Sequence, residues 1–239
     1  MTPWGTWLSC EESHEGVATG RDREHGYVFE VAAAADAAVD PQPLTALGRF
    51  LHEAVAVDAD GTVYLTEDNG YDSGLYRFTP SVNGTLDAGS LEMLAIIGRP
   101  GHDPAYAQPA GVQLPVSWVP IADPDPATSG VDSSAVFNQG FNGGGARFKR
   151  LEGCCIRDDT LFVSATEGGD AGLGQVWAYD IARAILWLCY EARAPEYLFG
   201  PDSLAVGSWS DRIVVAEDNG NGDPTAPSAL DGWTARDVR

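Results

Sequence analysis

A repeated strand-turn-strand pattern constrains this chain more than any other sequence feature. Three segments open with an acidic residue, continue through an apolar run, turn at small polar residues and return to another acid; they are residues 53–70, 152–169 and 202–220. Apolar runs on both sides of a short polar turn are typical of β-hairpins, and matched acids at both ends indicate true repetition. An ordinary β-sandwich with similar hairpins is the alternative.

The first two hairpins are each followed by two further strand-like runs. Residues 74–79 and 91–97 follow the first hairpin, and residues 174–180 and 184–191 follow the second. Four antiparallel strands within about 45 residues are the signature of a propeller blade. The sequence therefore predicts an all-β fold, a β-propeller built from four-stranded antiparallel blades.

The chain forms a single propeller domain or part of one, residues 1–239, in this interpretation. About 13 strands are predicted, whereas six blades need about 24, so the chain is expected to form an incomplete arc. The only helix candidate is the Ala-rich run 31–38, and a strand is expected at 44–50. The expected division is a partial blade at 1–50, a blade at 51–97, an inserted loop region at 98–147, a blade at 148–192, a partial blade at 200–220 and an irregular tail at 221–239.

Composition excludes several classes of partner. The 239 residues carry 35 acidic and 14 basic side chains, a formal net charge of −21, which argues against nucleic acid or an anionic membrane surface. No run approaches the roughly 20 apolar residues of a membrane span. The opening residues 1–4 lack the features of a signal peptide, as in a cytoplasmic protein or a chain that starts inside a longer one.

Four cysteines in a chain of this length do not indicate a disulfide framework. Cys154 and Cys155 are expected to be buried small hydrophobes. Cys10 differs because it lies in the polar run Ser9-Cys10-Glu11-Glu12.

The hairpin acids are expected to share one rim of the fold. In an antiparallel hairpin, the start of the first strand and the end of the second lie side by side. The inner strands of a propeller converge on a central channel, so Glu53, Glu152 and Asp202 would line one mouth of it. Aligning the first partial blade with the hairpins places Cys10 and Glu11 at the same level. The closing acids beside them are Glu67, Asp68, Glu167, Glu217 and Asp218.

Carboxylates gathered at one mouth repel one another unless a cation compensates them. Carboxylate oxygens suit Ca²⁺ or Mg²⁺, whereas a thiolate such as Cys10 favours a transition metal, so both together would make a mixed-metal cluster. The alternative is that these acids only end strands and form turns with the following Asn and Gly. Arg150 lies two residues before Glu152 and could clamp a phosphate through bidentate hydrogen bonds.

Several segments resemble the PhoX-type alkaline phosphatases. Residues 2–12, which read TPWGTWLSCEE, closely resemble the TPWGTWLTCEE segment of that family. Further motifs follow in the expected order: Leu51-His52-Glu53-Ala54, Arg150-Leu151-Glu152-Gly153 and Ala216-Glu217-Asp218-Asn219. The resemblance covers nearly the whole chain.

The resemblance implies a six-bladed propeller that hydrolyses phosphomonoesters with iron and calcium. It implies that Cys10 ligates iron, that Glu53, Glu152, Glu217 and Asp218 are among the iron or calcium ligands, and that Arg150 holds the phosphate attacked by a metal-activated oxygen. It also implies a periplasmic or extracellular location and a small-molecule substrate. Two alternatives stay open on the residues alone: a non-catalytic calcium-binding propeller or interaction module, and a calcium-dependent lactonase.

Overall fold

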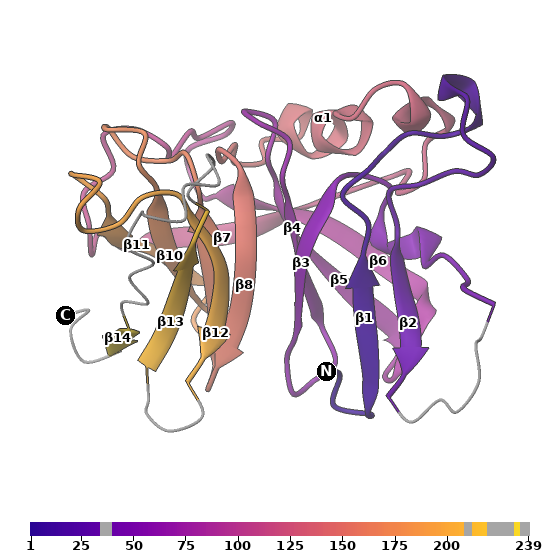
Figure 1. Cartoon of the computed structure of the whole chain (residues 1–239), viewed down its shortest axis with the longest axis horizontal. Helices are drawn as coiled ribbons and strands as arrows, with labels where there is room; N and C mark the ends of the chain where they lie inside the picture. The colour runs from indigo at the N-terminus through magenta and orange to yellow at the C-terminus, as the bar shows by residue number, and fades with distance from the viewer. Residues whose placement is uncertain (34–39, 208–211, 219–231, 235–239) are drawn as a thin grey trace.

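The computed structural model describes residues 1–33, 40–207, 212–218 and 232–234, and its architecture is nearly all β (Figure 1). Its strands form three antiparallel sheets, so the predicted all-β class is confirmed. β1 (Thr6–Cys10) pairs with β2 (Val28–Ala32), and β12 (Pro201–Val206), β13 (Arg212–Glu217) and β14 (Gly232–Thr234) form the three-stranded sheet. The nine-stranded sheet contains β3 (His52–Val57), β4 (Val63–Glu67), β5 (Leu75–Val82), β6 (Thr85–Ile96), β7 (Leu114–Pro120), β8 (Leu151–Arg157), β9 (Thr160–Ala165), β10 (Gln175–Asp180) and β11 (Ile185–Glu191).

The nine-stranded sheet consists of two four-stranded units joined edge to edge. β3 to β6 form one unit and β8 to β11 the other, each strand pairing with the next along the chain. The three predicted hairpins and the third and fourth strands of both units are therefore confirmed. Because β3 also packs against β8, the sheet curls until its two end strands lie side by side (Figure 1).

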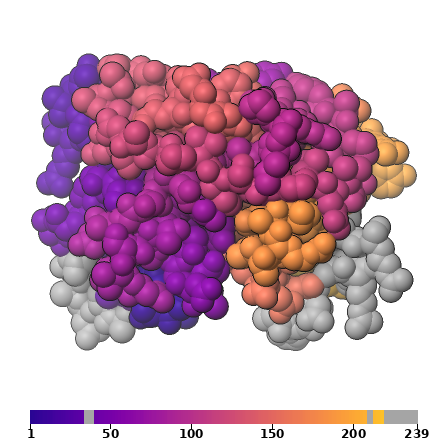
Figure 2. Space-filling model, turned by 180° about the vertical axis from the view of Figure 1, so that it is seen from behind, coloured from indigo at the N-terminus to yellow at the C-terminus, as the bar shows by residue number. Residues whose placement is uncertain are grey.

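β7 joins the two units and corrects the prediction for residues 98–147. This region was expected to be an inserted loop, yet β7 pairs with β6 and with β11, the outer strands of both units. Leu114 and Val116 bury their side chains between the units, but Pro115 and Pro120 obscured the strand pattern. From behind, residues of this region spread across the upper part of the molecule (Figure 2).

Four other local predictions differ from the structure. The helix α1 (Ala135–Asn142) lies in the same region, and its short Asn- and Gly-containing sequence gave no clear helical period. Val31 and Ala32 of the helix candidate belong to β2, whereas residues 34–39 lie outside the described part of the chain. Within the expected strand 44–50 the structure has a 3-10 helix, Thr45–Leu47, ending at Gly48 with φ of 100°. β14 occupies part of the tail expected to be irregular, pairing with β13.

The first strands of successive units stand next to one another. β1 packs beside β3, β3 against β8, and β8 against β12 (Figure 1). This order is the one expected of the inner strands of propeller blades, so the structure is compatible with a propeller arc. The division of the chain into blades stays a prediction.

Within the described part of the chain, the two largest of three buried clusters of side chains hold the nine-stranded sheet together. One lies between the two four-stranded units, where Trp118 makes an edge contact with Tyr179 and Phe148 with Trp177. The other packs Phe50 and Tyr76 beneath α1 and the β1–β2 pair. Among the described residues, no helix is long and apolar enough to cross a membrane.

Gly153 sets the spacing between β8 and β12. A Cβ atom at this position would lie 2.5 Å from the backbone nitrogen of Leu204 and 2.6 Å from the carbonyl oxygen of Asp202. Because backbone atoms cannot move aside as a flexible side chain can, only glycine allows the two strands to approach this closely.

We therefore expect Gly153→Ala to destabilise the fold by about 1–3 kcal/mol, since the strands must separate to admit the methyl group. Urea unfolding measures the change. Ser203→Ala, at an exposed position of β12, is the matched control and should shift stability by less than about 0.5 kcal/mol. Equal stability of the two variants would contradict the close approach of β8 and β12.

Candidate metal centre

The same irregularity occurs at the start of three inner strands. In each hairpin the pairing shifts by one residue just after the first pair: between His52 and Val55, between Leu151 and Cys154, and between Pro201 and Leu204. The opening acid of each hairpin lies inside this shift. A β-bulge bends a strand and redirects the side chains within it, so the three hairpins present their acids in the same way.

The bulges bring three carboxylates together. One oxygen each from Glu53 of β3, Glu152 of β8 and Asp202 of β12 lies within 4.8 Å of the other two. These residues are 99 and 50 positions apart along the chain, so the contact is wholly tertiary. The structure thus joins the three opening acids that the sequence predicted to share a rim.

Hydroxyl groups on the second strands tie this arrangement together. The Thr66 hydroxyl of β4 donates to the carbonyl of Glu152 at 2.6 Å and accepts from the backbone of Ala54 at 3.0 Å. One unit further, the Ser164 hydroxyl of β9 donates to the carbonyl of Asp202 at 2.5 Å. Each second strand therefore holds the acid-bearing residue of the next inner strand.

The electrostatics of the cluster favour a bound cation. Burial, with smaller contributions from Glu12 and the other rim carboxylates, raises the pKa of Glu53 to about 7. Burial and then Asp68 raise the pKa of Glu152 to about 8, and burial followed by Asp218 raises that of Asp202. The rim therefore resists full ionisation at neutral pH, as expected where several carboxylates converge.

Arg150 is the cation beside this cluster. Its Nε and Nη2 each donate at 3.0 Å to the two carboxylate oxygens of Asp68, and Nη2 also lies 2.7 Å from Glu152 Oε1. Nη1 is engaged more loosely, 3.8 Å from Glu167 Oε1. Asp68 holds the guanidinium in one orientation, and its hydrogen bonds are the main cause that raises the pKa of Arg150.

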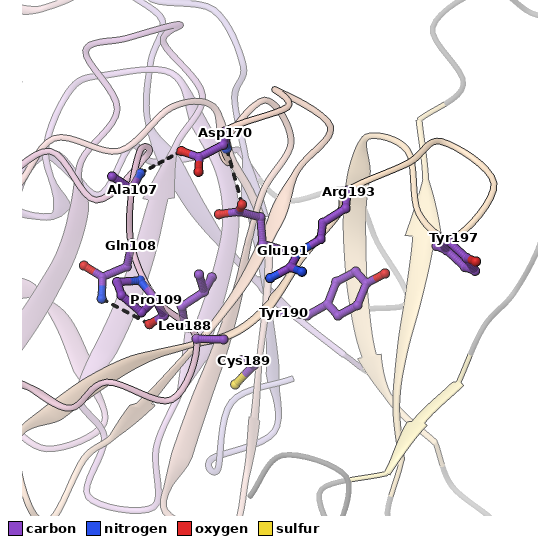
Figure 3. Close-up of a pocket in the computed structure, with 11 residues that line it drawn as sticks. Ala107, Gln108, Pro109, Asp170, Leu188, Cys189, Tyr190, Glu191, Arg193 and Tyr197 are labelled. Carbon is purple, nitrogen blue, oxygen red and sulfur yellow. Dashed lines mark hydrogen bonds between the residues drawn. The ribbon is translucent and has the colours of Figure 1, made fainter.

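Arg150 also borders a cavity of about 260 Å³. The cavity has a mixed lining of charged, polar and aromatic residues: Arg150, Thr166, Glu167, Gly172, Phe199, Gly200 and Asp218. A larger cavity, about 500 Å³, lies between loop 107–110 and β11, and none of the three clustered acids lines it (Figure 3). The three acids do not line the smaller cavity either, but Arg150 and Asp218 do, so the smaller cavity is the one that borders the rim.

A family model described as "Alkaline phosphatase PhoX" matches residues 1–222 of the 239-residue chain. The chain belongs to the PhoX alkaline phosphatase family. The family supports an alkaline-phosphatase-like function in general. No curated protein matches the chain.

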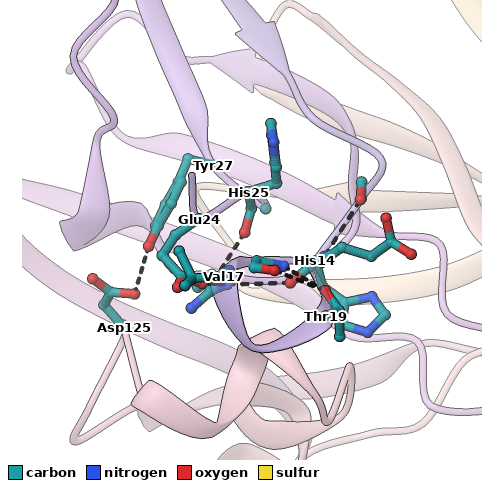
Figure 4. Close-up of polar contacts among 12 residues, drawn as sticks. His14, Val17, Thr19, Glu24, His25, Tyr27 and Asp125 are labelled. Atoms are coloured by element: carbon teal, nitrogen blue, oxygen red, sulfur yellow. Dashed lines mark hydrogen bonds and ion pairs between the residues drawn. The ribbon is translucent and has the colours of Figure 1, made fainter. Parts of the chain in front are cut away.

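Glu11, one of the metal ligands that we predicted for this PhoX-family chain, has other partners. Its carboxylate accepts from the backbone of Gly26 at 2.9 Å and of Tyr27 at 3.2 Å, and it lies 2.9 Å from His25 Nδ1. The adjoining segment is anchored through buried Arg49, which pairs with Glu24, and through Tyr27, which donates to Asp125 (Figure 4). Glu11 thus braces the hairpin that carries Cys10.

Glu12 lies near the cluster although its sequence position was not predicted to belong to the site. Its carboxylate contributes to the raised pKa values of Cys10, Glu53 and Asp202, so it lies within electrostatic range of all three. Because side chains alternate along an extended chain, residues 10 and 12 are expected on one side and residue 11 on the other. That alternation was the available signal.

Cys10 lies beside the three acids without joining them. Burial first, and then Glu53 and Glu12, raise its pKa to about 12, so the thiol keeps its proton unless a cation binds nearby. The position is anchored because the His52 backbone amide donates to the Glu11 carbonyl at 3.0 Å, which joins the end of β1 to the start of β3.

The closing acids fall into two groups. Glu67 is fully buried, where Tyr76 and the backbone of Gly74 donate to its Oε2 at 2.6 and 3.1 Å. Glu217 accepts from the backbone of Phe199 at 2.8 Å, whereas Asp218 is exposed and lines the cavity of Arg150. By strand register Ala165 occupies the place of Glu67 and Glu217, so Glu167 lies two residues further along. Thus Asp218, unlike Glu67, borders the site.

The raised pKa values predict how stability depends on pH without metal. The unfolded carboxyls lose their protons near pH 4.5, whereas folded Glu53 and Glu152 keep theirs to about pH 7 and 8. The folded state binds more protons in between, so stability should fall as pH rises from 5 to 8. Thermal unfolding in chelator measures this. Glu53→Gln should flatten the dependence, and exposed Asp87→Asn should not.

Calcium should reverse this trend, because the cation and the protons compete for the same oxygens. The increase in melting temperature on adding calcium should therefore be greater at pH 8 than at pH 5. An unchanged pH dependence in Glu53→Gln would show that the clustered carboxylates do not titrate as described.

Thr66→Val tests the bond that holds the Glu152 backbone. The substitution keeps the shape but removes one buried donor and one acceptor, so we expect a loss of about 1–3 kcal/mol in the free energy of unfolding. Weaker calcium binding should accompany it, because Glu152 is released. Thr79→Val, at an exposed position of β5, is the control. Unaltered calcium affinity together with unaltered stability would exclude this role.

Proposed function

We propose that this chain hydrolyses phosphate monoesters at the rim formed by Glu53, Glu152, Asp202 and Arg150. The observation that carries the proposal is an oriented arginine beside converging carboxylates and next to a cavity, in a chain of the PhoX family. A phosphate needs positive charge, and the described rim supplies more negative charge than Arg150 alone offsets. The site therefore requires further cations.

The residues present fit the metals that the family implies. The three carboxylates are the hard oxygen donors that calcium prefers. Cys10, with Glu53 and Glu12 in electrostatic range, offers the thiol and carboxylate mixture suited to iron. We propose calcium at the clustered acids and iron near Cys10, with Asp218 a further candidate ligand. Bound cations would offset the rim charge and polarise the phosphoryl oxygens.

Arg150 has the donors to hold the phosphate. Asp68 fixes the plane of the guanidinium through Nε and Nη2, which leaves Nη1, 3.8 Å from Glu167, to reach a phosphoryl oxygen in the cavity. Negative charge shifts towards the leaving oxygen as the ester bond breaks and water adds to phosphorus. A fixed guanidinium stabilises that charge without reorganising during the reaction.

Arg150→Lys tests this role. Lysine keeps the charge but loses the fork that Asp68 orients, so kcat/KM for p-nitrophenyl phosphate should fall about 100-fold in the metal-loaded chain. Arg157→Lys, at the last residue of β8, the strand that begins directly after Arg150, is the matched control. Activity unchanged in Arg150→Lys would contradict the proposed role of the arginine.

Metal content decides between this proposal and the non-catalytic alternatives. Elemental analysis should find both iron and calcium, and Cys10→Ser should remove iron and turnover together. Calcium without turnover, and indifference to Cys10→Ser, would favour a calcium-stabilised binding module. On the basis of the family alone, we also propose action in the periplasm or outside the cell, on small soluble esters.

A further inference from the structure

Two exposed tyrosines stand close to the arginine rim. Tyr71 is 51% exposed and Tyr106 is 43% exposed, although the hydroxyl groups of the two rings are hydrogen-bonded at 2.7 Å. Tyr71 lies in the loop between β4 and β5, and Tyr106 in the loop that follows β6. Aromatic rings held in solvent offer faces on which another planar group can stack.

A continuous set of contacts joins this pair to Arg150. The Lys149 ammonium lies 4.7 Å from the centre of the Tyr71 ring and 3.2 Å from Glu167 Oε2. Glu167 in turn is the carboxylate 3.8 Å from Arg150 Nη1. The edge of Arg150 that faces Glu167 is therefore also the side on which Lys149 and the tyrosines lie.

The Tyr71 loop is fixed against the Arg150 segment. The Arg150 backbone amide donates to the Gly70 carbonyl at 2.9 Å, and Asp68 at the start of the loop binds the guanidinium. The Phe148 amide donates to the Ser73 carbonyl at 2.8 Å, and Arg147 pairs with Asp72 at 3.3 Å. Contacts on both sides of Tyr71 thus set its position relative to Arg150.

The Tyr106 loop is fixed from the opposite side. The Gly169 amide donates to the carbonyl of Ala105 at 2.8 Å, and the Ala107 amide donates to Asp170 Oδ1 at 2.7 Å. Ala107 has a φ of 51°, a left-handed conformation that alanine adopts at a cost and that these contacts hold. The two tyrosines are therefore positioned before any ligand binds, which lowers the entropy cost of binding.

Building on the proposed phosphatase function, we propose that the Tyr71–Tyr106 pair binds the base of nucleoside monophosphates whose phosphate is held by Arg150. A nucleobase is planar and uncharged, so it can stack on an exposed ring in an otherwise acidic protein. The phosphate supplies the negative charge for Arg150. Any nucleobase can stack on an aromatic ring. The tyrosine pair therefore favours substrates that carry a base over substrates that lack one, and it does not distinguish one base from another.

Adenosine 5′-monophosphate and ribose 5-phosphate form a matched pair of substrates. In both esters the phosphate is on the primary hydroxyl at C5 of a ribose, and only the first carries a base. The metal-loaded chain should favour the nucleotide about tenfold in kcat/KM, mainly through KM. Tyr71→Ala and Tyr106→Ala should each remove most of this preference and leave ribose 5-phosphate turnover unchanged. Tyr71→Phe should retain it.

Phe199→Ala is the control variant, because Phe199 is the exposed aromatic residue that lines the cavity of Arg150. If Phe199→Ala abolishes the preference and the tyrosine variants keep it, the base stacks in the cavity and the proposal is wrong. Equal turnover of both esters by the unaltered chain would also overturn it, while upholding the phosphatase function.

Equilibrium binding separates this proposal from the function on which it rests. If neither ester is hydrolysed but the nucleotide binds more tightly than ribose 5-phosphate, and Tyr71→Ala abolishes that difference, the base site stands and the phosphatase proposal fails. Absence of any such difference in binding and in turnover would refute the base site.

Discussion

Mutual repulsion among carboxylates at one rim is the constraint on which the rest of the structure depends. Glu53, Glu152 and Asp202 each have an oxygen within 4.8 Å of the other two, and burial and like charge raise their pKa values. A fold that gathers such groups must hold them in place mechanically and compensate them electrically. Arg150 supplies part of the compensating positive charge, and the negative charge that it does not offset favours cations at this rim.

Structural features that repeat from unit to unit hold these carboxylates in place. The same bulge opens three inner strands, and hydroxyls of Thr66 and Ser164 hold the acid-bearing backbone of the next strand. Gly153 allows β12 to approach β8 at backbone distance. β7 closes the outer side by joining β6 to β11. The strand β7 joins the units on the outer side, and the inner strands pack closely together. These two features place the carboxylates of the three hairpins on one rim.

Much of the site could be predicted because equivalent residues of the repeated hairpins occupy equivalent positions in the fold. Glu53, Glu152 and Asp202 open equivalent strands, so equivalent strands packed side by side bring them together. Glu11 and Glu67 were less predictable. Glu11 binds backbone amides of the β1–β2 hairpin, and Glu67 is buried against Tyr76. The spacing along the sequence gives the position of each acid in its strand. The side to which the acid points depends on the local alternation of side chains and on the hydrogen-bond donors nearby.

The sequence by itself determined the all-β class, the three hairpins, the family and the rim on which the opening acids gather. These depend on local periodicity and on repeated motifs, which are readable along the chain. Only the tertiary structure decided that Asp68 orients Arg150 and that β7 unites the two four-stranded units. Each of these depends on which distant segments touch, a property that no local pattern in the chain encodes.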